Sequence, residues 1–189
     1  LEWANGSLLE IQSGPTLEGS AAARAIRPAG RHYDYDVRAL TLGIWASGEW
    51  QLAERWFLGI DGRFDRSAYR YDNRMRAGNS DESGLPCAFG GCLYSRPADR
   101  SDSFAGFTPK FHLRYTPTGE HSLYFVLARG FRRPETTELY RLQRQQAVAS
   151  LRSELLDSAE LGWIVGHQQV RASVAAFAMR KQHVILRDS

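Results

Sequence analysis

The sequence has no run of 18 apolar residues, so it encodes no transmembrane helix. It also has no basic stripe. Its 24 Lys and Arg are interspersed with 21 Asp and Glu, and the net charge of +3 does not indicate a nucleic-acid surface. Methionine is scarce at 2 residues, whereas glycine reaches 17 and aromatic residues reach 12%. This composition favours β structure over a helical bundle. The missing apolar run leaves a membrane barrel open, since a barrel strand needs only about 9–11 residues of alternating polarity.

Cysteine is nearly absent too, and the two residues present, Cys87 and Cys92, share the short segment CAFGGC. A zinc site would need two further ligands nearby, and none is visible. We therefore predict a local disulfide, which implies an oxidising compartment. The alternative is a pair of free thiols.

Apolar residues instead recur at every second position. Leu40, Leu42 and Ile44 share one face of the segment 39–52. In 55–71 the charged residues Asp61, Arg63 and Asp65 share a face opposite an apolar one. Such alternation indicates strands. The eight strands predicted in this way are 6–12, 15–26, 39–52, 55–71, 103–116, 121–131, 157–166 and 169–181. In 121–131 and 169–181 both faces are fairly apolar, so the outward face stays open.

Short and long connections alternate between these strands. The short ones are 13–14, 52–55, 116–120 and 166–167, and the long ones are 27–36, 72–102 and 132–156. The predicted fold class is therefore all-β. It is a segment of an up-and-down antiparallel transmembrane β-barrel, with its long loops at the extracellular end. We expect 72–102 and 132–156 to be mobile because they carry few apolar anchors. Within the second of these loops we predict a short helix with Thr136 or Thr137 as its N-cap.

The aromatic residues and Arg129 fit this interpretation. Trp50 and Trp56 flank a short connection, as anchors at a membrane interface should. Four tyrosines lie where strands enter long loops, and their alternative role is ordinary core packing: Tyr33, Tyr35, Tyr69 and Tyr71. Arg129 should face the lumen or the rim, because an arginine facing lipid at the midplane costs about 2–4 kcal/mol.

Several motifs resemble the β-barrel of TonB-dependent outer-membrane receptors, a family with "SPK", "LY…RGFR-x-P", "ELY" and "PE…S-x-ELG" elements. Here these elements are Thr108-Pro109-Lys110, Leu123-Tyr124, Arg129 to Arg132 with Pro134, Glu138-Leu139-Tyr140, and Ser153-Glu154 with Ser158, Glu160, Leu161 and Gly162. The match is specific from about 104 to 189 and weaker over 37–75. Ser153 replaces the usual proline, which is a minor departure.

The resemblance implies a barrel of about 22 strands filled by an N-terminal plug. On this basis residues 1–189 are about eight strands of such a barrel. The plug, the TonB-contacting segment and the C-terminal strands are absent from the chain. The expected whole is a bacterial outer-membrane receptor that imports a scarce ligand with energy from TonB, through the missing N-terminal region. The expected ligand is foremost a ferric siderophore, otherwise haem, cobalamin or a sugar. The expected surroundings are outer-membrane lipid and lipopolysaccharide. We expect no enzymatic activity, no cofactor, no metal site and no nucleic-acid partner.

Family members bind their ligands through loops and the plug apex. Arginine and tyrosine suit an anionic chelate with aromatic groups. The candidate ligand-binding residues are Tyr33, Tyr35, Arg74, Arg76, Tyr94, Arg96, Arg100, Arg132, Arg133 and Tyr140, with His32 beside them. For each of them the alternative is a solvated loop residue or a contact to lipopolysaccharide. Arg129 and Arg132 match the family motif and are expected to serve the structure of the barrel and its loops.

Two other functions remain open. A small outer-membrane barrel enzyme would pair a histidine with a nucleophile or an acid at its rim. No such pairing is suggested for the five histidines His32, His112, His121, His167 and His183. A soluble β-sandwich binding module would have long loops at both ends. It would also expose Asp61, Arg63 and Asp65 on its surface, whereas a barrel would turn them into the lumen.

Overall fold

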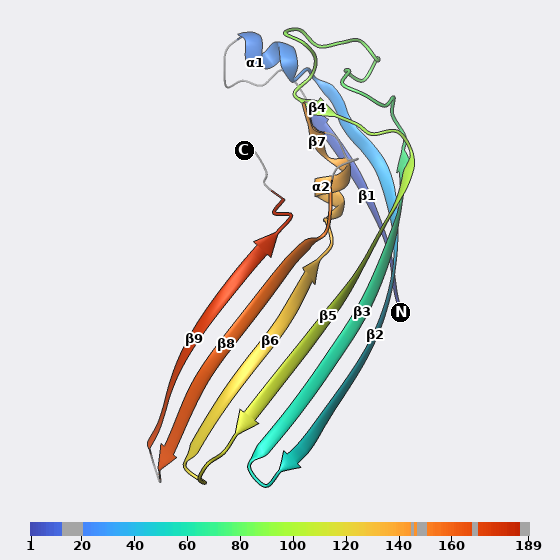
Figure 1. The fold of residues 1–189 in the computed structure, drawn as a ribbon. Coiled ribbons are helices and arrows are strands. Elements are labelled where there is room, and N and C mark those ends of the chain that lie inside the picture. Colours follow the sequence, from blue (N-terminus) through green and yellow to red (C-terminus); the bar gives the residue numbers. More distant parts are fainter. Residues whose placement is uncertain (13–20, 145, 147–150, 168–169, 186–189) are drawn as a thin grey trace. The chain divides into compact units, whose positions relative to one another are not determined.

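Seven strands form one antiparallel sheet in the order β1-β2-β3-β5-β6-β8-β9 (Figure 1). The structure is a computed structural model, which describes residues 1–12, 21–144, 146, 151–167 and 170–185. The strands of this sheet are β1 (Glu2–Gln12), β2 (Gly30–Ala53), β3 (Trp56–Asn73), β5 (Arg100–Tyr115), β6 (His121–Arg132), β8 (Glu154–His167) and β9 (Val170–Gln182). The remaining elements are α1 (Ala21–Ile26), α2 (Thr136–Tyr140) and a small sheet of β4 (Tyr94–Ser95) with β7 (Leu142–Gln143). Spatial order follows chain order, so the predicted up-and-down all-β fold is confirmed.

Three predicted segments are wrong, and the strands predicted at 6–12, 103–116 and 157–166 begin three or four residues earlier, at Glu2, Arg100 and Glu154. The predicted strand 15–26 ends in α1, because Ala21, Ala22 and Ala23 open a segment of high helix propensity. Residues 13–20, which hold the predicted turn 13–14, lie outside the described residues. The predicted loop 27–36 is mostly strand, since β2 starts at Gly30 and pairs with β1 from there on. Residues 166–167 belong to β8 rather than to a turn.

The chain divides into two compact units that separate the long connections from the short ones. Unit 1 comprises Leu1–Leu42, Ser67–Phe104 and Pro134–Arg152; unit 2 comprises Gly43–Arg66, Ala105–Arg133 and Ser153–Ser189. The long β3–β5 connection, and the β6–β8 connection from Pro134 to Arg152, lie in unit 1. The β2–β3 and β5–β6 turns lie in unit 2. The predicted alternation of short and long connections therefore holds for these strands.

Unit 2 presents large apolar side chains to its surroundings. Trp50 and Trp56, on either side of the β2–β3 turn, are both exposed, and Trp56 stacks on Tyr115 with ring centroids 4.5 Å apart. The exposed large apolar side chains of residues 43–66 are Ile44, Trp45, Trp50, Leu52, Trp56, Ile60 and Phe64. Strands that meet lipid carry such side chains without a protein core to cover them. Among the described residues no helix is long and apolar enough to cross a bilayer.

Several charged side chains of unit 2 form ion pairs with each other. Arg129 lies directly opposite Asp157 on β8, and its Nε and Nη2 donate to the two carboxylate oxygens at 2.6 and 3.1 Å. Arg63 forms a similar pair with Asp65, at 2.6 and 2.7 Å. Gly43 makes room for that pair, since a Cβ there would lie 2.7 Å from Asp65 Oδ1. Pairing lowers the cost of placing these charges on the wall of a barrel.

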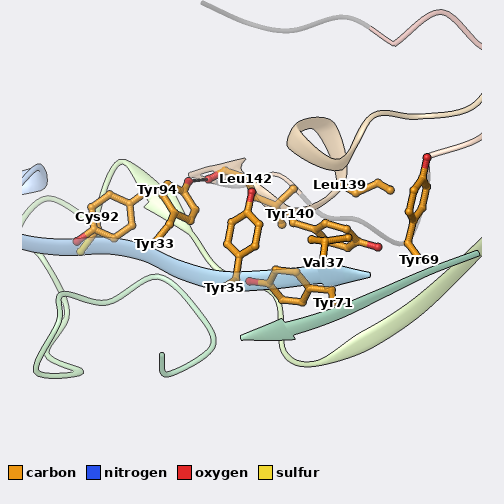
Figure 2. Packing of buried hydrophobic residues seen from close by; sticks show 10 residues of the cluster. All are labelled: Tyr33, Tyr35, Val37, Tyr69, Tyr71, Cys92, Tyr94, Leu139, Tyr140 and Leu142. Carbon is orange, nitrogen blue, oxygen red and sulfur yellow. Dashed lines mark hydrogen bonds between the residues drawn. The ribbon is translucent and has the colours of Figure 1, made fainter. Parts of the chain in front are cut away.

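Unit 1 contains every member of the buried hydrophobic cluster that the described residues form (Figure 2). Tyr33, Tyr35 and Val37 come from β2, and α2 covers them with Leu139 and Tyr140. The other members are Tyr69, Tyr71, Cys92, Tyr94 and Leu142. Both long connections therefore contribute buried apolar groups, so the stated reason for expecting mobile loops is wrong. The alternative role of Tyr33, Tyr35, Tyr69 and Tyr71, core packing, is the one that the structure shows.

The short helix predicted in the second long loop is present as α2, but its N-cap is Glu135 rather than Thr136 or Thr137. The Glu138 carboxylate accepts a hydrogen bond from the Glu135 backbone N–H at 2.7 Å. A capping box requires an acceptor three residues after the cap. Only Glu135 has one, because the residues three positions after the two threonines are Leu139 and Tyr140.

Candidate ligand-facing site

Stacked tyrosines join the β6–β8 connection to strands β2 and β3 in unit 1. The Tyr71 ring lies flat on the Tyr140 ring, with centroids 4.4 Å apart and an interplanar angle of 19° (Figure 2). Tyr35 packs on Tyr71, with the two ring centroids 5.0 Å apart. The Tyr33 hydroxyl donates to the Leu142 carbonyl at 2.6 Å. Such pairs contribute beyond their buried area, so this layer fixes α2 and β7 over the strands.

A chain of polar contacts through Asp102 and Arg100 fixes the hydroxyl of Tyr140. This hydroxyl donates to Asp102 Oδ2 at 2.9 Å. Arg100 grips the same carboxylate through Nε and Nη2, at 2.8 and 2.6 Å. Burial, followed by the bond to Asp102, raises the pKa of the Tyr140 hydroxyl well above its ordinary value. Tyr140 therefore stays protonated at neutral pH and acts as a hydrogen-bond donor rather than as a phenolate ligand.

Arg96 is the organising residue of the β3–β5 connection. Its side chain is 2% exposed, and its guanidinium faces backbone carbonyls instead of a carboxylate. It donates to the carbonyls of His32 at 2.9 Å, Arg76 at 2.9 Å and Ser80 at 2.6 Å. The charge also lies 5.4 Å from the centroid of the Tyr94 ring. All of these partners belong to unit 1, so Arg96 ties the connection to the start of β2.

The predicted disulfide is confirmed and lies beside Arg96 in the chain. Cys87 and Cys92 are bonded to each other. The connection turns between them through Phe89, Gly90 and Gly91, all with positive φ, and Phe89 is largely exposed. The two glycines that close the loop adopt this backbone conformation without strain.

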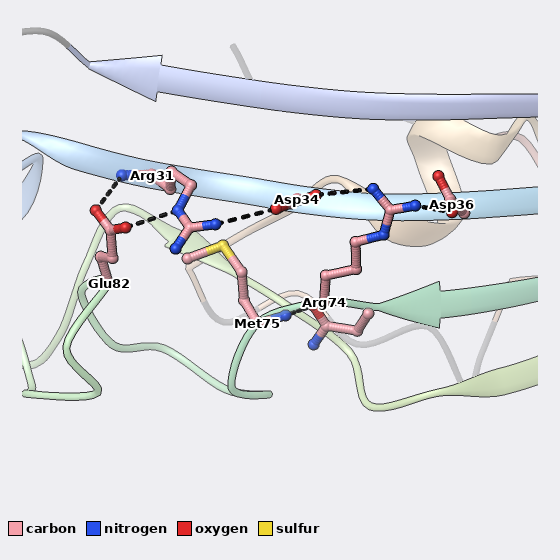
Figure 3. A network of polar contacts seen from close by, with 7 residues as sticks. Arg31, Asp34, Asp36, Arg74, Met75 and Glu82 are labelled. Atoms are coloured by element: carbon pink, nitrogen blue, oxygen red, sulfur yellow. Dashed lines mark hydrogen bonds and ion pairs between the residues drawn. The ribbon is translucent and has the colours of Figure 1, made fainter.

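An ion-pair network runs along the outer part of β2 (Figure 3). Glu82 accepts bonds from the Arg31 backbone N–H at 2.9 Å and from Arg31 Nε at 2.6 Å. Arg31 also pairs with Asp34 at 3.2 Å, and Arg74 bridges Asp34 and Asp36. The bonds from Arg31 hold the pKa of Glu82 below its usual range. Because Arg74 pairs with both Asp34 and Asp36, its guanidinium is occupied by carboxylates rather than available to a ligand.

The family of the chain follows from a comparison with known proteins. The model of the family described as "TonB dependent receptor-like, beta-barrel" matches residues 9–189. The chain belongs to this family. The resemblance drawn from the sequence motifs is thereby confirmed.

Solved structures share the fold of this receptor segment. One of them, the structure named "Copper transporter OprC", is 16% identical to this chain, with a TM-score of 0.59. The match covers 82% of this chain and 23% of that one. The receptor segment thus spans under a quarter of the length of that protein, and the likeness concerns the fold alone. No curated protein matches the chain.

The receptor structure brings together part of the candidate set. Tyr33, Tyr35, Tyr94 and Tyr140 belong to one buried cluster, and His32 stacks on Tyr94 at 4.2 Å. Arg76 is exposed, and its side chain makes no ion pair with a described residue. Arg132 and Arg133 belong to unit 2, where Arg132 Nε donates to Glu154 Oε2 at 2.7 Å. No part of the chain that the structure describes gathers three His, Cys, Asp or Glu side chains able to hold a metal ion.

Sequence reasoning missed Asp102 and Arg141 as organisers of this receptor surface. Arg141 Nη2 donates to Glu10 Oε2 at 2.6 Å and lies 6.0 Å from the Tyr33 ring centroid. The alternation of 100–104 could have placed Arg100 and Asp102 on one strand face. The Arg141–Glu10 pair spans 131 residues and has no local signal.

Proposed function

We propose that the chain is part of the barrel wall of an outer-membrane transporter that imports a scarce ligand with energy from TonB. Membership of the receptor family supports this reading. Each end strand, β1 and β9, has one neighbour in the sheet, so its other edge needs a partner in a closed barrel. In this proposal the remaining strands, the plug and the TonB-contacting segment come from outside these 189 residues.

One observation carries the membrane assignment: large apolar side chains are exposed along the strands of unit 2. Ile44 is 63% exposed, Leu52 60% and Trp50 51%, and all three lie on the same face of β2. In water each such side chain would forgo about 1.5–3 kcal/mol of burial. A soluble sandwich would turn them into a core, whereas a barrel turns them to lipid. This contrast favours the transporter over a soluble binding module.

For the ligand we propose an anionic metal chelate, a ferric siderophore foremost. The exposed arginines of unit 1 support it, because guanidinium groups bind carboxylate and hydroxamate-type oxygens through charge-assisted bonds. Arg76 is the best candidate for direct contact, since its side chain is exposed and unpaired with any described residue. Arg96, Arg100 and Tyr140 would act by positioning the loops. The name of the structural relative makes copper the second ligand to test.

The test uses the full-length receptor in the bacterium that encodes it. The native protein should sediment with the outer membrane at a mass several times 21.3 kDa. Uptake of iron-55 supplied with each of a panel of siderophores should fall on deletion of the receptor and on deletion of TonB. Uptake of copper-64 that falls in both deletions, with iron uptake unchanged, would replace the siderophore by copper. A native product of 21.3 kDa in the soluble fraction would overturn the transporter.

A variant links the ligand to unit 1. Arg76→Ala should lower siderophore affinity about tenfold, because one charge-assisted bond contributes about 1.5 kcal/mol. Arg55→Ala removes another exposed arginine, at the β2–β3 turn, and should leave affinity unchanged. Equal affinities for both variants and wild type would remove Arg76 from the site.

A further inference from the structure

Two arginines face each other across β2 and β3 in unit 1. The Asp34 backbone carbonyl accepts a hydrogen bond from the Arg74 backbone N–H at 2.9 Å. The side-chain hydroxyls of Thr41 and Ser67 form a hydrogen bond at 3.1 Å. Counting along the antiparallel ladder from either contact places Arg38 opposite Arg70. Both are exposed, and both line the same two surface hollows.

Neither guanidinium has a partner among the described residues. The carboxylates near them are mostly engaged: Asp36 pairs with Arg74, and Asp99 accepts the Asn73 N–H at 2.8 Å. Asp72 lines one hollow without reaching salt-bridge distance of either arginine, so two positive groups face one uncommitted carboxylate. Like charges directly opposite one another destabilise a strand pair. The pair is therefore a site with an excess of unpaired positive charge.

An apolar wall adjoins the two arginines. Leu40 is the next residue on the strand face of Arg38, and Trp3 lies opposite Leu40 on β1. Both are exposed, Trp3 at 64% and Leu40 at 47%. With Arg38, Arg70 and the exposed hydroxyl residues Ser101 and Ser103 they line a groove of about 320 Å³. The groove is therefore positively charged at one end and apolar at the other.

On this strand face the side chains change from charged to apolar between Arg38 and Leu40. Asp34, Asp36 and Arg38 occupy alternate positions before the change, and Leu40 and Leu42 follow. If the strand lies in a barrel wall, as proposed above, this is the level at which hydrocarbon gives way to headgroups at the long-loop end.

We propose that Arg38 and Arg70 bind the phosphate of an outer-leaflet lipid, whose acyl chain lies along Trp3 and Leu40. Two guanidinium groups can each donate two bonds to phosphate oxygens, which would neutralise the like-charged pair. The apolar wall selects a lipid over a free phosphate ion. This site rests on the barrel-wall part of the proposed function and is independent of the imported ligand.

The experiment titrates delipidated full-length receptor in detergent micelles and counts bound lipid by native mass spectrometry. The probes are bisphosphorylated lipid A, the same lipid without phosphates, and inorganic phosphate, all with EDTA to exclude bridging divalent cations. Wild type should bind the phosphorylated lipid at least about tenfold more tightly than the other two probes. Equal binding of the dephosphorylated lipid would overturn phosphate recognition. Equal binding of inorganic phosphate would overturn the lipid.

Variants separate this site from general charge and from folding. R38Q/R70Q should lose at least about tenfold in affinity for the phosphorylated lipid, while R55Q/R171Q, which removes two other exposed arginines, should not. R70E gives Arg38 a carboxylate opposite it, so it should raise the lipid-free melting temperature and abolish lipid binding. R70E that binds lipid like wild type would overturn the site. Siderophore uptake unchanged in R38Q/R70Q would separate the lipid site from the transport function, and loss of transport in the TonB deletion tests that function alone.

Discussion

Replacing Arg96 by methionine should release the β3–β5 connection from the strands. Methionine keeps most of the volume and removes every donor. The carbonyl of His32 would be left buried without a partner, which costs about 1–3 kcal/mol. The carbonyls of Arg76 and Ser80 are partly buried and lose about 0.5–1.5 kcal/mol each, since water can replace part of each bond. Together these losses lower the local opening free energy by about 2–6 kcal/mol.

Hydrogen exchange of residues 74–99 in the detergent-solubilised full-length receptor measures this quantity. An opening free energy lowered by about 2 kcal/mol or more corresponds to exchange at least about thirtyfold faster. R96K tests whether the charge alone suffices. A lysine has the charge but lacks the planar fork that reaches three carbonyls, so it should rescue exchange only in part.

R76A provides the control, because its exposed side chain is unpaired with any described residue and only its backbone carbonyl binds Arg96. Its exchange rates should stay within about threefold of wild type. Exchange of R96M within the same threefold would show that the carbonyls do not depend on Arg96. The reasoning from its buried contacts would then fail.

Three further outcomes are expected. Non-reduced receptor should resist thiol labelling at Cys87 and Cys92, and labelling at both would contradict the disulfide. Tyr140→Ala should lower the opening free energy of the β6–β8 connection by about 3–5 kcal/mol, measured by hydrogen exchange, because its fully buried ring leaves a cavity; unchanged exchange would contradict this. The ion pair between Arg31 and Glu82 lowers the pKa of the Glu82 carboxyl in the folded state. The ion pair should therefore be intact above the ordinary glutamate pKa and be lost as the pH falls through the lowered pKa of Glu82. Protease cleavage after residue 82 should rise over that window in wild type and be independent of pH in E82Q.

The alternation of apolar and polar residues was enough to predict strands, but not to predict which residues pack over them. The alternation of 39–52 and 55–71 depends only on near neighbours, so β3 and the second half of β2 could be predicted, whereas the first half of β2 was predicted as a loop. The same alternation put Tyr69 and Tyr71 on one face without showing whether lipid or protein meets that face. The covering residue, Tyr140, lies 69 positions beyond Tyr71 in the chain and reaches it only through the fold of a long connection.

The candidate site divides along the same line. The disulfide was predictable because Cys87 and Cys92 are five positions apart. Arg96 was recognised as a loop arginine, but its role depends on the carbonyl of His32, 64 positions away. A residue type indicates the chemistry a side chain can perform. The contacts of the side chain in the folded protein decide whether it stabilises the fold or is available to bind a ligand.

Tyrosine in place of leucine in the core of unit 1 has a physical reason. A ring packs like an apolar side chain, and its hydroxyl fixes a direction, as Tyr33 does on the Leu142 carbonyl. The hydroxyls of Tyr71 and Tyr94 are buried with no hydrogen-bond partner among the described residues. Each such group costs about 1–3 kcal/mol unless a partner is supplied. In the larger plugged barrel proposed above, polar groups from outside these residues could accept these two hydroxyl hydrogen bonds.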